Sequence, residues 1–258
     1  MDRKAIMLLF VTAWVACASA RCAAEEPFSS RGLRHGHMFL IWNEAGEAPK
    51  ITLTSAVFGK YTDGLEYKVI GAEGKALASG EVDAGGKAEI TGLPTSPRYL
   101  VTAEPGMNGV QIAVDRPYGM VVGPTHPLGP NVPTGRLYFY VPPGCKAFNL
   151  VACCQSPKEG AKIVLHRPDG SAAGELEGEL DEETTLKVAV PAGGGDAVWA
   201  IEFLPPTTPG TFLDDVALYL EGEMPMLLCP KAEWAGRMGK EAWKMDAGTR
   251  GHGDGGTR

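Results

Sequence analysis

Positive charge is scarce in this sequence, which holds 24 lysines and arginines against 31 aspartates and glutamates and has a net charge of −7 at pH 7. A protein that binds nucleic acid needs a basic surface to pair with phosphates, so the composition argues against a nucleic-acid partner. Long apolar runs are scarce too. Beyond residue 20 no run approaches the ~20 apolar residues of a transmembrane helix, so we expect no membrane span after that point.

The short motifs that mark common enzyme classes are also missing. The chain contains no G-x-S-x-G elbow, no H-E-x-x-H, no phosphate-binding loop and no dinucleotide-binding glycine pattern. An acidic run at 177–183 is typical of a solvated turn rather than of the paired carboxylates of a glycosidase. The sequence therefore predicts a protein that is not an enzyme, with an uncharacterised glycan hydrolase as an alternative.

The N-terminus has the features of a secretory signal peptide. Arg3 and Lys4 precede an apolar run at 5–16, which is too short to span a bilayer. Small residues at 18–20 (Ala-Ser-Ala) then form a cleavage pattern. We expect residues 1–20 to be removed and the mature chain to be secreted, periplasmic or on the cell surface. A buried N-terminal helix and lipidation of Cys17 are the alternatives.

Export changes how the cysteines are interpreted, because an oxidising compartment permits disulfides. An odd number of cysteines remains after cleavage, so at least one thiol stays unpaired within the chain or forms a disulfide with another chain. Adjacent strand residues point to opposite faces, so Cys153 and Cys154 cannot serve the same bridge. We expect structural bridges or buried thiols, with the pairing left open. The mature cysteines are Cys22, Cys145, Cys153, Cys154 and Cys229.

The hydrophobic period is close to 2 along most of the chain, which is typical of strands. Turn-forming residues separate the runs, and the 34 glycines and 20 prolines are many for a helical protein. Short strands separated by frequent turns indicate an all-β protein built from sandwiches. The predicted strands are 37–42, 51–58, 65–70, 76–82, 87–91, 99–103, 110–114 and 119–122, then 137–141, 148–154, 162–166, 174–179, 184–190, 198–204 and 216–220.

We predict two β-sandwich domains in tandem, at 33–122 and 136–230. The proline-rich segment between them, 123–135, is predicted as an extended linker, because proline removes ladder donors and stiffens the chain. From residue 231 the strand pattern stops and glycine is frequent. Residues 231–258 are therefore predicted as a flexible, disordered tail, with a short helix at 234–244 as an alternative.

Several strand and turn motifs of the second predicted domain occur in a suggestive order. They are LYFYVPPGCKAFNL at 137–150, IVLHRPDG at 163–170, VWAIEF at 198–203 and FLDDVALYLEG at 212–222. Together they resemble the jelly-roll accessory modules of secreted bacterial glycoside hydrolases and related surface proteins, over residues 130–228. The first predicted domain resembles immunoglobulin or fibronectin type III modules in its strand number and Gly-rich hairpins.

The resemblance implies a non-catalytic module that binds carbohydrate or another cell-surface ligand. In such modules a carboxylate at the position of Asp214 and Asp215 helps to hold a structural calcium ion, and calcium prefers oxygen ligands. A solvated strand start is the alternative for this pair. A structural or assembly protein of the cell envelope, with a protein partner and no small ligand, is the alternative for the chain.

Aromatic side chains that bind sugar rings must be exposed. Strand alternation puts Tyr138 and Tyr140 on one face, away from the better core face of their strand, so they are candidate ligand-binding residues, with an interface to the first sandwich as the alternative. Trp42 is a further candidate, but it shares a face with other apolar residues, so core packing is favoured for it, as it is for Trp199.

His35 and His37 form an H-x-H pair that could bind a transition metal with a third ligand, but we predict both as surface histidines just ahead of a strand.

Overall fold

The computed structural model describes residues 33–154 and 156–250. The chain is all-β over these residues, apart from one C-terminal helix, and its strands form several antiparallel sheets. No helix in the described residues combines the length and the apolar character needed to cross a bilayer. The predicted signal peptide, Cys17, Cys22 and residues 251–258 lie outside the described residues.

All the predicted strands are confirmed, with ends that differ by no more than two residues. Only the short strand β16 was not predicted. The strands are β1 (His37–Trp42), β2 (Ile51–Ala56), β3 (Leu65–Gly71), β4 (Ala76–Val82), β5 (Lys87–Ile90), β6 (Arg98–Glu104), β7 (Gly109–Val114), β8 (Tyr118–Val121), β9 (Gly135–Val141), β10 (Ala147–Cys154), β11 (Gly160–His166), β12 (Ala172–Glu179), β13 (Thr184–Ala189), β14 (Ala197–Leu204), β15 (Val216–Gly222) and β16 (Leu227–Leu228).

The first strand group consists of β1–β8 with β16. It contains a six-stranded sheet in the order β16-β8-β1-β6-β3-β4 and a three-stranded sheet in the order β5-β2-β7. Burial alternates along β1 and β2, as expected for strands with one face on a core. Phe39 and Val101 are fully buried on the inner face of the larger sheet, and Leu53 is fully buried on the smaller one.

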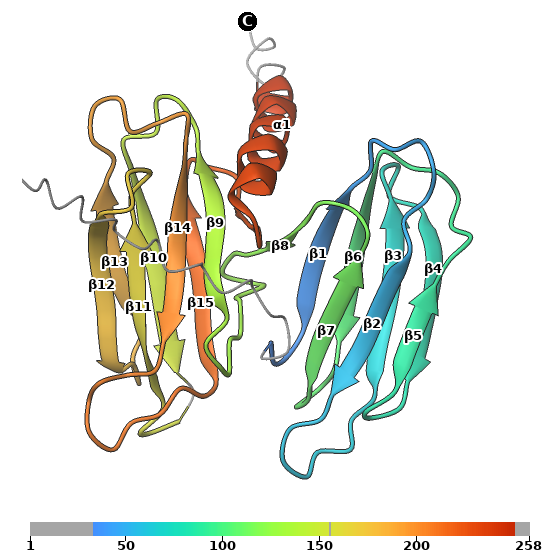
Figure 1. Cartoon of the computed structure of the whole chain (residues 1–258), viewed down its shortest axis with the longest axis horizontal. Coiled ribbons are helices and arrows are strands. Elements are labelled where there is room, and N and C mark those ends of the chain that lie inside the picture. Colours follow the sequence, from blue (N-terminus) through green and yellow to red (C-terminus); the bar gives the residue numbers. More distant parts are fainter. Residues whose placement is uncertain (1–32, 155, 251–258) are drawn as a thin grey trace, which may run out of the picture.

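The second strand group consists of β9–β15. Its sheets have the orders β12-β11-β14-β9 and β13-β10-β15. An aromatic cluster joins the two sheets, because the Phe148 ring packs edge-on against Phe139 at 5.5 Å and against Trp199 at 5.4 Å between ring centroids. Trp199 is 1% exposed, which confirms the expected core packing. Figure 1 places this group beside the first one.

The segment 123–135 connects the two strand groups, but it is not a free linker. Leu128 is fully buried and exchanges both backbone hydrogen bonds with Leu218 of β15, at 2.7 and 2.8 Å. Pro130 forms a bridge with Leu33, just ahead of the first strand. The prolines fix an extended path, as expected, but apolar residues between them give the segment a buried face.

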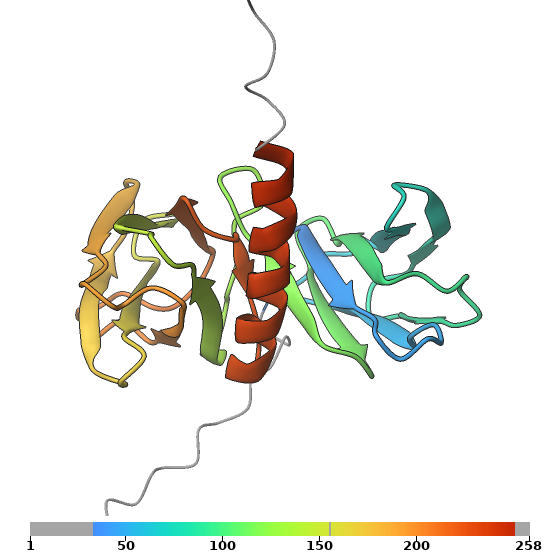
Figure 2. The ribbon, with the colours of Figure 1, turned by 90° about the horizontal axis from the view of Figure 1, so that it is seen from above.

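The prediction of a flexible tail from residue 231 is wrong for residues 232–250, which form helix α1 (Ala232–Arg250). The short helix considered at 234–244 lies inside it. Ala235 and Met238 of α1 are 1% and 0% exposed, and the Trp234 ring lies 5.7 Å from that of Tyr118 on β8. Figure 2 shows α1 along the line where the two strand groups meet. Tertiary packing, more than helix propensity, stabilises it.

Candidate ligand-binding face

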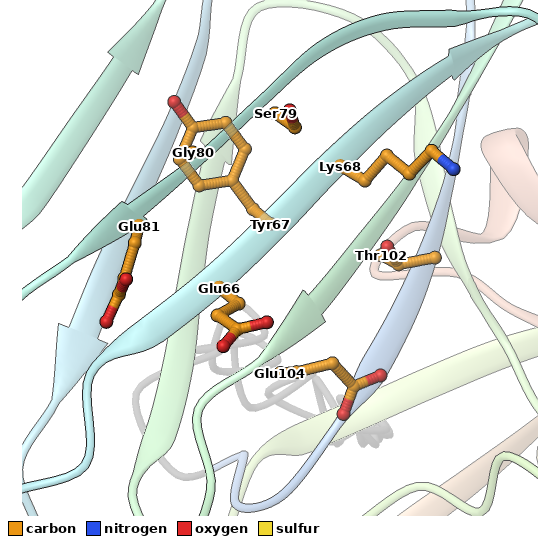
Figure 3. A pocket seen from close by; sticks show the side chains of 8 residues that line it. All are labelled: Glu66, Tyr67, Lys68, Ser79, Gly80, Glu81, Thr102 and Glu104. Carbon is orange, nitrogen blue, oxygen red and sulfur yellow. The ribbon is translucent and has the colours of Figure 1, made fainter.

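An open hollow of about 550 Å³ lies on the six-stranded sheet, across β4, β3 and β6. We call it the sheet-face hollow. Figure 3 shows its side chains rising from three neighbouring strands. Its lining residues are Glu66, Tyr67, Lys68, Ser79, Gly80, Glu81, Thr102 and Glu104.

The strand register arranges these side chains in two rows that cross the strands. In the first row Glu66 lies directly between Glu104 of β6 and Glu81 of β4. In the second row Lys68 lies between Thr102 and Ser79 in the same way. Residues directly opposite one another in an antiparallel pair point to the same face, with Cβ atoms roughly 5 Å apart. The hollow therefore presents a fixed grid of polar groups.

The three glutamates of the first row place like charges directly opposite one another on neighbouring strands. Like charges directly opposite one another destabilise an antiparallel pair, by about 0.2–1 kcal/mol per pair. Glu66, Glu81 and Glu104 are all exposed, and no ion pair joins them to a cation within the described residues. The arrangement is tolerated because water screens it. Stability does not explain the row, which makes a binding role worth testing.

Tyr67 lies between Glu66 and Lys68 on β3, so its side chain points to the opposite face of the sheet, where it packs against the core. It is half-buried, and its ring lies against Gly80 of β4, where an added Cβ would come within 2.7 Å of the Tyr67 hydroxyl oxygen. Glycine at this position makes room for the ring. It shares this inner face with Leu65 and Val69, which are fully buried, so Tyr67 is not part of the polar grid.

The aromatic residues singled out from the sequence lie elsewhere, around α1. Tyr140 is 4% exposed, so the expectation that it is an exposed platform residue is wrong. Its side chain lies so close to α1 that a Cβ added to Gly239 would come within 2.3 Å of the Tyr140 Cβ. Tyr138 is half-buried and packs in the same small cluster as Met238. The face that alternation left uncovered is covered by α1 and also by the first strand group, because Tyr138 exchanges backbone hydrogen bonds with Cys229, directly after β16.

A hydrogen bond and an ion pair, both made by Asp196, link Tyr140 to the helix. The Tyr140 hydroxyl donates a 2.7 Å hydrogen bond to Asp196, and Lys240 of α1 lies 2.9 Å from the same carboxylate. Burial is the main reason that the pKa of Tyr140 is raised, and the bond to Asp196 adds to it. The contact with Lys240 lowers the pKa of Asp196. Tyr140 is thus a packed, neutral hydrogen-bond donor.

Trp42 lies on the outer face of β1, not in the core. The buried residues of β1 are those that alternate with it, and Trp42 itself is half-buried beside α1. Its indole nitrogen donates a 3.0 Å hydrogen bond to Glu44, which also forms an ion pair with Arg237 of α1. Trp42 and the sheet-face hollow therefore share one face of the sheet but occupy different parts of it.

Asp214 and Asp215, the predicted calcium ligands, both contact Arg34. The Arg34 Nη1 atom lies 3.1 Å from Asp214 Oδ1 and 2.5 Å from Asp215 Oδ1. Arg34 is 5% exposed, and its guanidinium also donates to the Met107 carbonyl oxygen at 3.2 Å. A guanidinium here neutralises the carboxylates that a cation would need. Within the described residues no group of three or more His, Cys, Asp or Glu side chains is placed to hold a metal ion.

Other titratable groups are buried in the interior. His37 is 4% exposed on the inner face of β1, so the prediction of a surface histidine is wrong for it, and burial lowers its pKa from about 6.5 to about 4. The described cysteines, which are Cys145, Cys153, Cys154 and Cys229, form no disulfide with one another. Burial raises the pKa of the Cys154 thiol to about 12 and raises that of Cys229 as well. These thiols are protonated and unreactive at neutral pH, as buried thiols are expected to be.

Comparison with known proteins gives no relative. No family model, no curated protein and no solved structure matches the chain.

Proposed function

We propose that this protein is a secreted, non-catalytic binding protein that holds a carbohydrate on the sheet-face hollow. The observation that carries the proposal is the pair of polar rows fixed by the register of β4, β3 and β6. A sugar hydroxyl both donates and accepts hydrogen bonds. Glutamates accept, a lysine donates, and serine and threonine do both, so the grid offers partners for neighbouring hydroxyls. Strands hold such groups more rigidly than loops do.

A binding role fits the hollow better than a hydrolytic one. Carboxyl groups that act as general acids sit in desolvated pockets that keep them protonated near neutral pH. Glu66, Glu81 and Glu104 are all exposed on an open sheet face. Nothing around them distinguishes an acid from a nucleophile, so we propose no catalytic step here.

Three further parts of the proposal rest on the sequence patterns. Each strand group is a sandwich domain, the first immunoglobulin-like and the second jelly-roll-like, and this is supported by strand pairing that stays largely within each group. Secretion rests on the signal-peptide pattern of residues 1–20. A structural calcium ion at Asp214 and Asp215 is the part with least support, because Arg34 already pairs with both carboxylates.

An assembly role is the second candidate, and a specific observation favours it. Met38, Leu40, Ile70 and Leu100 are half-buried on the outer face of the same sheet, between the hollow and α1. An apolar strip beside polar residues is typical of protein–protein contact surfaces. Under this alternative a partner protein, rather than a sugar, covers the face.

Binding of the full chain to neutral polysaccharides, including β-glucan, xylan, mannan and soluble chitin fragments, tests the proposal. Lys68→Val removes the donor at the centre of the second row and keeps a residue suited to strands. Lys187→Val makes the same change at an exposed position of β13, in the second strand group, and is the matched control.

We expect at least one polysaccharide to bind, and Lys68→Val to weaken binding about tenfold, because hydrogen bonds to charged groups contribute about 1.5–3 kcal/mol. Lys187→Val should bind like the unaltered protein. Equal binding by both variants, or no binding of any polysaccharide, would contradict the proposal and favour the assembly role.

A further inference from the structure

A second pocket, of about 290 Å³, lies where the two strand groups meet. We call it the junction pocket. Residues at 34–36 and Glu104 line it from the first strand group, and residues at 125–127, Gly129 and residues at 215–217 line it from the opposite side. Its volume is near the lower end of the roughly 300–1,000 Å³ range of small-molecule sites. It therefore suits one ring-sized group rather than an extended ligand.

The junction pocket brings together three buried polar atoms that lack hydrogen-bond partners within the described residues. These are Arg34 Nε, His35 Nε2 and Asp215 Oδ1. The Asp215 oxygen lies 2.5 Å from Arg34 Nη1 and 3.4 Å from His35 Nε2, so the charges attract, but neither contact has hydrogen-bond geometry. These three atoms have almost no accessible surface, so they set the mixed charge of the pocket wall and do not themselves contact a ligand.

The backbone around the junction pocket is strained in two places. His35 has a φ of 63° and Asp215 a φ of 43°, both in the left-handed region that costs a non-glycine residue about 1 kcal/mol or more. The two residues come from opposite sides of the pocket and contact one another. Such strain clusters at ligand sites, because the surrounding structure holds side chains in the positions that binding needs.

The junction pocket continues the glutamate row of the sheet-face hollow. Glu104 lines both. Its carboxylate lies directly over the backbone of Gly36, where an added Cβ would come within 2.1 Å of Glu104 Oε2. Strands are about 4.8 Å apart, so the path from Glu81 on β4 through Glu66 and Glu104 to His35, just ahead of β1, crosses three inter-strand spacings, roughly 15 Å. A ligand of several linked units fits this path better than a single small molecule.

The polar groups of the junction pocket select a neutral polyhydroxyl ligand. The Arg34 guanidinium only donates hydrogen bonds, whereas the Asp215 and Glu104 carboxylates only accept them. An anion would be repelled by the carboxylates and a cation by the guanidinium. A hydroxyl group serves both kinds of partner. Pro127, Val216 and Ala217 add apolar contact on the side away from the sheet.

We infer that the junction pocket binds the terminal sugar unit of a glycan chain whose next units lie on the sheet-face hollow. The inference rests on the proposed function. Since the second strand group lines the far side of the pocket, the chain ends there, and the protein recognises glycan ends rather than chain interiors.

Titration calorimetry measures binding of the full chain to neutral hexasaccharides and to their longer parent polymers. The series are β-glucan, xylan, mannan and soluble chitin fragments. His35→Asn and Asp215→Asn alter the junction pocket, and asparagine tolerates the left-handed backbone at both positions. Asp214→Asn is the matched control, because Asp214 also pairs with Arg34 but does not line the pocket.

We expect the two pocket variants to bind about tenfold more weakly than Asp214→Asn, and the protein bound per glycan chain to stay constant as the chain lengthens. Protein bound in proportion to chain length, or equal binding by all three variants, would overturn the inference. If Lys68→Val weakens binding while the pocket variants do not, the result supports the proposed function and contradicts a terminal-sugar site in the junction pocket. If the unaltered protein binds no glycan, both fall.

Discussion

The contacts of Arg34 give a quantitative prediction about the junction between the strand groups. Its side chain is 7% exposed, that of Asp215 is 13% exposed, and that of Asp214 is 33% exposed. Replacing each aspartate by asparagine removes one negative charge and little volume. Asparagine also accepts the positive φ of residue 215, so Asp215→Asn tests the charge without adding backbone strain.

The burial of each pair sets the expected magnitude. Removing one partner of a buried ion pair costs about 3–5 kcal/mol, because the remaining charge is left uncompensated. Asp215→Asn leaves Asp214 in contact with the guanidinium, so we expect a loss nearer ~2–3 kcal/mol. Asp214→Asn removes the more exposed partner and should cost about 1 kcal/mol or less.

Urea unfolding of the full chain measures this difference. With slopes of ~2–3 kcal/mol/M for a chain of this size, Asp215→Asn should lower the midpoint by about 1 M and Asp214→Asn by less than half of that. Calcium added to the unaltered protein should leave the midpoint unchanged, because Arg34 pairs with both carboxylates. Equal losses, or the reverse order, would refute the reasoning. A calcium shift that Asp214→Asn abolishes would restore the calcium site.

Three more predictions follow from close contacts and burial. Gly239→Ala improves helix propensity by ~1 kcal/mol, yet it should lower the melting temperature, because the new methyl carbon would lie 2.3 Å from the Tyr140 Cβ. A higher melting temperature would contradict this packing. Gly36→Ala should displace the Glu104 carboxylate and weaken glycan binding, measured by calorimetry, without lowering the melting temperature. An unchanged affinity would show that Glu104 does not contact the glycan. His37 has a pKa of about 4 in the folded protein against 6.5 in the unfolded chain, so the unfolded chain binds more protons between these two pH values. The free energy of unfolding should therefore fall as the pH is lowered from 6.5 to 4. If His37→Leu does not flatten this pH dependence, the loss of stability belongs to other groups.

The strands were predictable because their physical signal is local. Alternation of apolar and polar residues with a period of 2, broken by Gly and Pro turns, places nearly every strand. The short strand β16 (Leu227–Leu228) has too few residues to show a period. It is defined instead by pairing with β8, a contact between distant parts of the sequence.

Helix α1 was mostly missed for a different reason. Glycines at 236 and 239 lower helix propensity and favour a disordered tail. In the structure Gly239 lies where α1 approaches Tyr140 most closely, so the residue that weakens the local prediction is required by the packing. The same contact explains why Tyr140, expected to be exposed by strand alternation, is buried.

The candidate site could not be predicted from the sequence, because it depends on the pairing register of β3 with β4 and β6. Glu66, Lys68, Thr102 and Glu104 were all placed in or next to predicted strands, but nothing local says which residues lie opposite one another. A shift of one residue in the pairing of β3 with β6 would move one strand's side chains to the other face and break both rows. Arg34 illustrates the same limit, since its partner Asp214 lies 180 residues away.

Carboxyl footprinting with a carbodiimide, read by mass spectrometry, tests the central claim most directly. The full chain is labelled with and without the saturating glycan that binds in the polysaccharide panel. The account predicts that bound glycan protects Glu66, Glu81 and Glu104, whereas Glu182, which is exposed in the second strand group, labels equally in both states. Equal labelling of the three glutamates with glycan bound would place the sugar elsewhere and contradict the account.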